Sequence, residues 1–216
     1  TKVKAFAGKD PKDFKEAKKV FGLAAEKYKP LRVYLSKIQE EVLAAVKGGF
    51  PEIPNPALKA RANMEKVAKS KGPNGPGFEL ELDLYIKHLT RYERSLAERL
   101  SFMRIVKDKC DLNIKNFTQM DRIISSTLKL LKAIFVAIPE AQTKAGVEIL
   151  NIMQSNIENK PKAVANAYKK LKKAAEQHEK LIAREHAYAK GRLKAANNKK
   201  LKFVMEDAKE FFKQLF

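Results

Sequence analysis

Apolar residues recur at a regular interval through residues 79–138, a stretch of the chain that has neither glycine nor proline. Between Leu82 and Ile138 there are sixteen steps over 56 residues, a mean of 3.5 residues per step. That period is typical of helices that supercoil about one another along an apolar seam. As one helix, the stretch would span about 90 Å. The predicted seam comprises Leu82, Tyr85, Leu89, Tyr92, Leu96, Leu100, Met103, Val106, Cys110, Ile114, Phe117, Met120, Ile124, Leu128, Leu131, Phe135 and Ile138.

Glycine and proline gather in short clusters, and the tracts between them predict further helices. The clusters "GGFPEIPNP" (48–56) and "GPNGPG" (72–77) predict turns. We expect a kink at Pro30 and a bend at Pro139. Nothing along the chain alternates with the period of two that marks a β-strand. The expected helices cover residues 11–47, 57–71, 79–138, 140–157 and 161–215.

The last tract carries a second apolar seam. Pro161 stands at its expected first turn, where proline is tolerated. Helices as long as 79–138 and 161–215 cannot bury a one-sided apolar stripe in a compact domain, so they have to lie along each other or along a second chain. This second seam comprises Val164, Tyr168, Leu171, Ala175, His178, Ile182, Ala189, Leu193, Ala196, Val204, Ala208, Phe211 and Leu215.

These patterns predict an all-α fold, an elongated antiparallel helical bundle or coiled-coil hairpin of long kinked helices. We expect one domain over residues 11–216, preceded by an N-terminal extension of residues 1–10. Because the seams need partners, we also expect a homodimer or a higher assembly. An ordinary globular helical bundle, whose long tracts are broken by further kinks, is the alternative.

The first residues allow two interpretations. Phe6, Phe14 and Phe21 alternate with lysines, as in an amphipathic segment at a lipid interface. Asp10 as a helix cap and Pro11 in the first turn instead predict an ordinary helix start. We favour the helix start, which leaves the preceding residues available for contact.

Charge is concentrated near the end of the chain. The 45 basic residues exceed the 25 acidic ones by 20, and residues 159–202 alone hold fourteen basic and three acidic residues. Advancing about 100° per residue places eight of these cations on one face, opposite the seam. Faces that only keep a protein soluble usually mix both signs. We therefore expect this face to bind an anion, with a merely solvated face as the alternative. It comprises Lys169, Lys172, Lys173, Lys180, Arg184, Lys190, Lys194 and Lys202.

The residue types on this face favour one kind of anion. Single-stranded nucleic acids need aromatic side chains among the cations, and base readout prefers arginine, asparagine or glutamine. Lysines instead suit diffuse attraction to an anionic bilayer. We expect an anionic membrane surface as the partner. The alternatives are a structural or packaging protein on a nucleic-acid backbone, and a helical subunit of a larger assembly that docks an acidic protein.

No pattern in the sequence points to catalysis, a metal ion, a cofactor or a small-molecule substrate. The Glu-x-x-His pairs of di-iron bundles are missing at His88, His178 and His186. Cys110 is the single cysteine and falls on the first seam. No apolar run reaches the ~18 residues of a membrane span. We expect a non-catalytic scaffold inside the cell, peripheral to a membrane or within a larger assembly.

Two very long helices interrupted by proline, with cations along the last, resemble the BAR superfamily of membrane-curving dimers. The final residues, "KKLKFVMEDAKEFFKQLF" (199–216), are similar to the C-terminal segment of such domains, which is rich in aromatic and acidic residues. The resemblance covers most of residues 12–216 and rests on architecture alone. It implies an antiparallel homodimer whose basic curved face lies against anionic lipid. The helix expected over residues 140–157 departs from the family pattern, and puts membrane contact through the hairpin tip in doubt.

Overall fold

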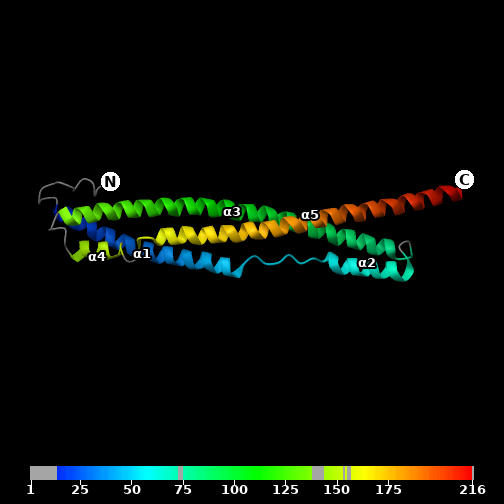
Figure 1. Ribbon diagram of the computed structural model, residues 1–216, viewed down its shortest axis with the longest axis horizontal. Coiled ribbons are helices and arrows are strands. Elements are labelled where there is room, and N and C mark those ends of the chain that lie inside the picture. The colour runs from blue at the N-terminus through cyan, green and yellow to red at the C-terminus, as the bar shows by residue number, and fades with distance from the viewer. Residues whose placement is uncertain (1–13, 73–74, 138–143, 153, 155–156, 216) are drawn as a thin grey trace. The chain divides into compact units, whose positions relative to one another are not determined.

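The chain folds into helices connected by short segments. The computed structural model describes the backbone of residues 14–72, 75–137, 144–152, 154 and 157–215, and none of these residues lies in a strand (Figure 1). The all-α class with long helices is confirmed. The helices are α1 (Phe14–Gly48), α2 (Ala57–Lys71), α3 (Phe78–Ala137), α4 (Lys144–Ile152) and α5 (Lys160–Leu215).

In the described residues the helix boundaries fall close to the expected ones. α3 begins at Phe78 and α5 at Lys160, one residue before each expected start. α1 runs through Pro30 as a 35-residue helix. α4 covers Lys144–Ile152, which lies within the helix expected over 140–157, and the described residues 154 and 157 are also helical, in the wider π form. The bend at Pro139, the helix start at Asp10 and Pro11, and the extension of residues 1–10 lie outside the described residues.

Local chemistry explains where the helices begin and end. The side-chain Oδ1 of Asn55 accepts a 3.1 Å hydrogen bond from the backbone N–H of Ala57, which satisfies a free donor at the start of α2. Gly72 follows α2 with a φ of 84°, a conformation that favours glycine. A Cβ atom at Gly75 would collide with the backbone carbonyl of Lys71. The turn between α2 and α3 therefore depends on glycine.

The chain divides into two compact units, each described here by itself. Unit 1 contains residues 1–49 and 106–174, and unit 2 contains residues 50–105 and 175–216. In unit 1, α1 and α4 lie side by side, and Lys29 Nζ is 3.0 Å from Glu148 Oε1. The core of unit 1 is formed by two clusters of buried residues, Ile124, Leu128, Leu131, Ile134, Leu150 and Ile157, and Leu35, Phe117, Val164 and Ala165.

The core of unit 2 is shared by α2, the first part of α3 and the second part of α5. On α5, Ala175, Ile182, Ala189 and Ala196 follow one another at intervals of seven residues, and each is at most 7% exposed. Three of these four are alanines, whose small side chains allow a neighbouring helix to approach closely. The buried residues of this core are Ala57, Ala60, Phe78, Leu82, Tyr85, Leu89, Tyr92, Leu96, Ile182, Ala189 and Ala196.

The expected seams are largely the buried faces of the helices. Every described seam residue of α3 is buried or half-buried. In each unit α3 and α5 are antiparallel. In unit 2 Asp83 pairs with Lys200 and Tyr92 with Glu185, and in unit 1 Asp111 pairs with Lys172 and Phe117 stacks with Tyr168. On the seam of α5 the exception is Val204, which is 49% exposed. Ile138 and the side chains of the last seam positions, Ala208, Phe211 and Leu215, lie outside the described part of the chain.

Candidate anion-binding surface

Seven of the eight cations expected on one face of α5 are exposed in the structure. Three of the eight, Lys169, Lys172 and Lys173, belong to unit 1, and the other five belong to unit 2. Within the described part of the chain, none of the seven exposed cations pairs with a carboxylate. We call these seven residues the α5 cation set: Lys169, Lys173, Lys180, Arg184, Lys190, Lys194 and Lys202.

Lys172 differs from the other seven. Its Nζ lies 2.7 and 2.8 Å from the two carboxylate oxygens of Asp111 on α3, and its side chain is 30% exposed. Lys172 directly follows the seam residue Leu171. It also comes four residues after Tyr168, whose ring stacks on Phe117 of α3 at 5.9 Å between centroids. Lys172 therefore lies beside the seam rather than opposite it, and its charge is largely neutralised.

Three further cations of α5, which sequence analysis left out of the binding face, contact neighbouring side chains in unit 2. Lys199 Nζ lies 4.3 Å from the ring centroid of Phe78. Lys200 Nζ is 2.6 Å from Asp83 Oδ1. Arg192 donates from Nε to the Tyr188 hydroxyl over 2.9 Å. Lys199 and Lys200 thus join α5 to α3, Arg192 contacts its own helix, and the α5 cation set faces solvent.

Apolar side chains are also exposed on α5, a feature that sequence analysis missed. Five of them are 49–60% exposed, and they lie among the cations of unit 2. Leu181 and Tyr188 each come one residue before a seam position. The sequence pattern alone therefore does not distinguish them from the buried apolar residues of the seam. Their exposure gives the helix surface a mixed basic and apolar character. They are Leu181, Tyr188, Leu201, Val204 and Met205.

His178 and His186 contact other side chains, and Cys110 is buried. His178 stacks on Phe50 at 5.1 Å between centroids, and no described residue forms a hydrogen bond with its buried Nε2. Burial lowers the pKa of His178, and the nearby positive charge of Arg99 lowers it further. His186 Nε2 lies 2.7 Å from Glu93 Oε1. Cys110 is buried, and this burial raises the pKa of its thiol.

Metal-ligating side chains do not gather in the described part of the chain. Among its residues there is no group of three or more His, Cys, Asp or Glu side chains close enough to hold one ion. The structure also has, within its described ranges, no helix that combines the length and the apolar character needed to cross a bilayer.

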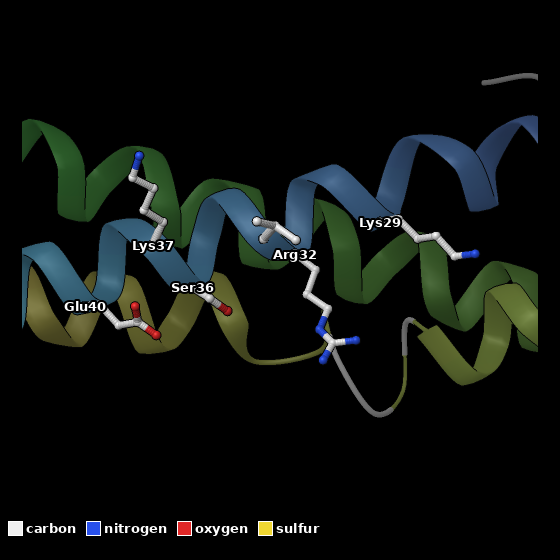
Figure 2. Close-up of a pocket in the computed structure, with 6 residues that line it drawn as sticks. Lys29, Arg32, Ser36, Lys37 and Glu40 are labelled. Atoms are coloured by element: carbon white, nitrogen blue, oxygen red, sulfur yellow. The ribbon is translucent and has the colours of Figure 1, made fainter.

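A surface hollow of about 500 Å³ beside α1 is also lined by cations. Its charges are mixed: Lys29 pairs with Glu148, and Lys37 lies 4.0 Å from Glu41. Figure 2 shows the Arg32 guanidinium and the Lys37 ammonium on opposite sides of the helix. The cations of this hollow therefore do not share one exposed face without carboxylates, as the α5 cation set does. The hollow is lined by Lys29, Arg32, Val33, Ser36, Lys37 and Glu40.

No protein-family model matches the chain, and no curated protein or solved structure does. The resemblance to the BAR superfamily stays a prediction based on architecture.

Proposed function

We propose that this protein is a non-catalytic helical scaffold that binds an anionic membrane surface through the α5 cation set. The observation that carries the proposal is the exposure of seven cations with no carboxylate partner in the described residues. Uncompensated like charges repel one another along a helix, so they destabilise the free protein slightly. An anionic surface would relieve this repulsion.

The apolar side chains on α5 favour lipid over the other anions. Leu181 follows Lys180, and Leu201 precedes Lys202, so aliphatic groups alternate with cations on an exposed surface. A helix at a bilayer interface uses both kinds of contact, since aliphatic groups enter the acyl boundary while lysines reach the headgroups. Contacts to a nucleic-acid backbone come from charged and polar groups, so they would leave these leucines unused.

Aromatic stacking on bases has little support on this helix. Tyr188 is 60% exposed, but the Arg192 guanidinium lies 5.1 Å over its ring. Single-strand binding usually places several open aromatic faces along a basic groove. A packaging protein on a nucleic-acid backbone and a subunit that docks an acidic protein therefore remain the alternatives to membrane binding.

The strength with which lysines attract an anionic bilayer bears on whether the protein binds as one copy or as a dimer. Each Lys or Arg near an anionic bilayer contributes about 1 kcal/mol, so the five members in unit 2 would supply about 5 kcal/mol. Alone, this corresponds to a dissociation constant of roughly 0.2 mM. Two copies that bind together would reach the nanomolar to micromolar range because the second contact becomes intramolecular. We therefore include the BAR-like homodimer in the proposal.

Sedimentation with vesicles tests the proposed function. The full chain is mixed with phosphatidylcholine vesicles that contain phosphatidylserine, with neutral vesicles, and in a separate series with duplex DNA, each at low and high salt. We expect tighter binding to the phosphatidylserine vesicles than to duplex DNA and no binding to the neutral vesicles, with all binding weakened by salt because exposed charges are screened beyond about 8–10 Å. Tighter binding to DNA than to the anionic vesicles would contradict the proposal and support the nucleic-acid alternative.

Sedimentation equilibrium of the free protein tests the dimer. A monomer at micromolar concentration would remove the homodimer from the proposal but would leave membrane binding to be judged by the vesicles.

A further inference from the structure

In unit 2, α5 extends past the helices that it packs against. The ring centroid of Phe203 lies 5.7 Å from that of Phe78, which is the first residue of α3. Because α5 runs antiparallel to α3, the residues after Phe203 have passed the start of α3. α5 nevertheless continues to Leu215, and Figure 1 shows its C-terminal end projecting beyond α2 and α3. The last turns of α5 therefore no longer have α3 beside them.

Three apolar side chains are exposed where α5 reaches this point, and each of them is 49–60% exposed. Leu201 comes one heptad after Lys194, and Val204 comes two heptads after Lys190, so they occupy the same outward face as these exposed lysines. The face of α5 that is basic up to Lys194 therefore turns apolar at Leu201. We call these residues the apolar end patch: Leu201, Val204 and Met205.

Contacts on the inner side of α5 keep the apolar end patch turned outward. Lys200 Nζ is 2.6 Å from Asp83 Oδ1, and Phe203 packs on Phe78. Lys200 and Phe203 stand on either side of Leu201 in the sequence, so α5 cannot rotate to bury the patch without breaking both contacts. The free protein therefore presents these apolar side chains to water, which is unfavourable until a partner covers them.

The size and the charge of the apolar end patch fit a lipid surface better than a second protein. Three side chains provide only a small part of the ~800 Å² that each partner buries in a stable protein interface. Lys194 and Lys202 border the patch, and within the described residues neither pairs with a carboxylate. Their ammonium groups complement anionic headgroups, whereas a second copy of this chain, with its net charge of +20, would bring further positive charge.

We propose that the apolar end patch inserts between the acyl chains of an anionic bilayer, and that it thereby selects membranes whose acyl chains are unsaturated and loosely packed. This insertion rests on the proposed membrane function and assigns its apolar contact to one end of α5. The α5 cation set attracts the headgroups, and the patch enters the boundary between headgroups and chains. Loose packing opens this boundary at a lower cost in free energy, so unsaturated lipids are preferred.

Tryptophan fluorescence tests the insertion. The chain has no tryptophan, so Leu201→Trp places a single one in the patch. Its matched control is Ala187→Trp, which is exposed two heptads earlier on the same face, among the cations. With phosphatidylserine vesicles whose acyl chains carry bromine atoms, the emission of Leu201→Trp should shift to the blue and be quenched several-fold more than that of Ala187→Trp. Equal quenching of both would overturn the insertion and leave the membrane function standing.

Binding to vesicles of two acyl compositions tests the selectivity. At equal phosphatidylserine content, the wild-type chain should bind dioleoyl vesicles several-fold more tightly than dipalmitoyl vesicles held above their melting temperature. Leu201→Gln combined with Met205→Gln should remove this preference and weaken binding roughly thirtyfold, the factor expected when about half of each side chain is no longer buried. The factor should be nearly the same at low and high salt, because salt screens charges and not apolar contacts. Leu58→Gln combined with Ile105→Gln, at similarly exposed sites of unit 2, should change neither.

Three outcomes would contradict the proposal in different ways. Salt-sensitive binding without a preference for dioleoyl lipids would overturn selection by acyl chains but keep the membrane function. Binding to no phosphatidylserine vesicle would defeat the membrane function and the insertion with it. Blue-shifted emission from Leu201→Trp in the absence of vesicles, increasing with protein concentration, would show instead that a second copy covers the patch. Far-ultraviolet circular dichroism of each variant shows whether the helices are kept.

Discussion

The hydroxyl group of Tyr92 on α3 donates a 2.6 Å hydrogen bond to Oε2 of Glu185 on α5. The next residue on each helix is also paired, since His186 Nε2 lies 2.7 Å from Glu93 Oε1. Burial raises the pKa of Tyr92 to about 12, and the Glu185 carboxylate favours the protonated hydroxyl as well. The phenol therefore remains a donor throughout the physiological range. Two adjacent polar contacts fix the register of α3 against α5 in unit 2.

Tyr92→Phe should destabilise the fold modestly. The substitution removes one hydrogen bond to a charged group, but Glu185 is solvent-exposed, so we expect a loss of about 1 kcal/mol in the free energy of unfolding. Urea denaturation measures this value. Tyr34→Phe, at a side chain that is 56% exposed, is the control and should change stability little. An equal effect of both substitutions would show that the Tyr92–Glu185 hydrogen bond does not stabilise the fold.

The apolar seam of α3 predicts a graded response to truncation. Leu96 is fully buried in the core of unit 2, so Leu96→Ala should cost about 2–5 kcal/mol. Leu100, also on the predicted seam, is only half-buried and should cost less. Leu80→Ala is the control: Leu80 is 66% exposed, and we expect a change within about 0.5 kcal/mol. A reversed order of Leu96 and Leu80 would refute this packing.

The helices and seams could be predicted from the sequence because they depend on local patterns. Glycine and proline mark the helix ends, and the 3.5-residue repeat selects the buried face. The face of α5 on which Lys172 lies was harder to predict. By counting about 100° per residue, Lys172 and Lys190 share one direction, yet a seam that repeats every seven residues drifts by about 20° per heptad relative to that count. Lys172 therefore lies beside the seam and reaches Asp111, while Lys190 is exposed.

Contacts between helices that are distant in the sequence could not be predicted. No local pattern links Tyr92 to Glu185 or Asp83 to Lys200, because such pairs depend on the register between helices. Periodicity also could not show which apolar side chains stay exposed. Leu181 has the same character as its buried neighbour Ile182, and only the position of the neighbouring helices distinguishes them.

The environment of His178 predicts a pH dependence of stability. Its pKa in the folded protein lies below the ordinary value of 6.5, because burial and the charge of Arg99 disfavour the protonated ring, against a weaker opposing effect of Glu185. Below pH 6.5 the unfolded chain binds the proton more readily than the folded one. The free energy of unfolding should therefore fall as the pH drops from about 6.5 toward the folded-state pKa.

Urea denaturation across this pH range measures the effect. His178→Phe retains an aromatic ring against Phe50 and should flatten the dependence. His88→Gln, a histidine elsewhere on α3, serves as the control. If the wild-type chain and His178→Phe lose stability in parallel, then another group is responsible.

Charge reversal on α5 separates a binding surface from a solvated one. We choose Lys173, Lys180, Lys190 and Lys194, which are exposed, and omit Lys172 because a glutamate there would repel Asp111. All four replaced by Glu should leave far-ultraviolet helicity unchanged, since none of them lies in the core. If each Lys contributes about 1 kcal/mol near a bilayer, the loss of four weakens binding to phosphatidylserine vesicles about a thousandfold, before repulsion is counted.

The matched control for this variant reverses four exposed lysines of unit 2 that lie outside α5: Lys59, Lys66, Lys69 and Lys87. Both quadruple variants change the net charge of the chain from +20 by the same amount, so a general loss of charge would weaken binding equally in the two. A localised surface on α5 instead predicts a loss in the first variant that is at least tenfold larger. Wild-type affinity in both variants would show that the α5 cation set only keeps the protein in solution, because attraction at an anionic surface cannot survive the reversal of the charges that cause it.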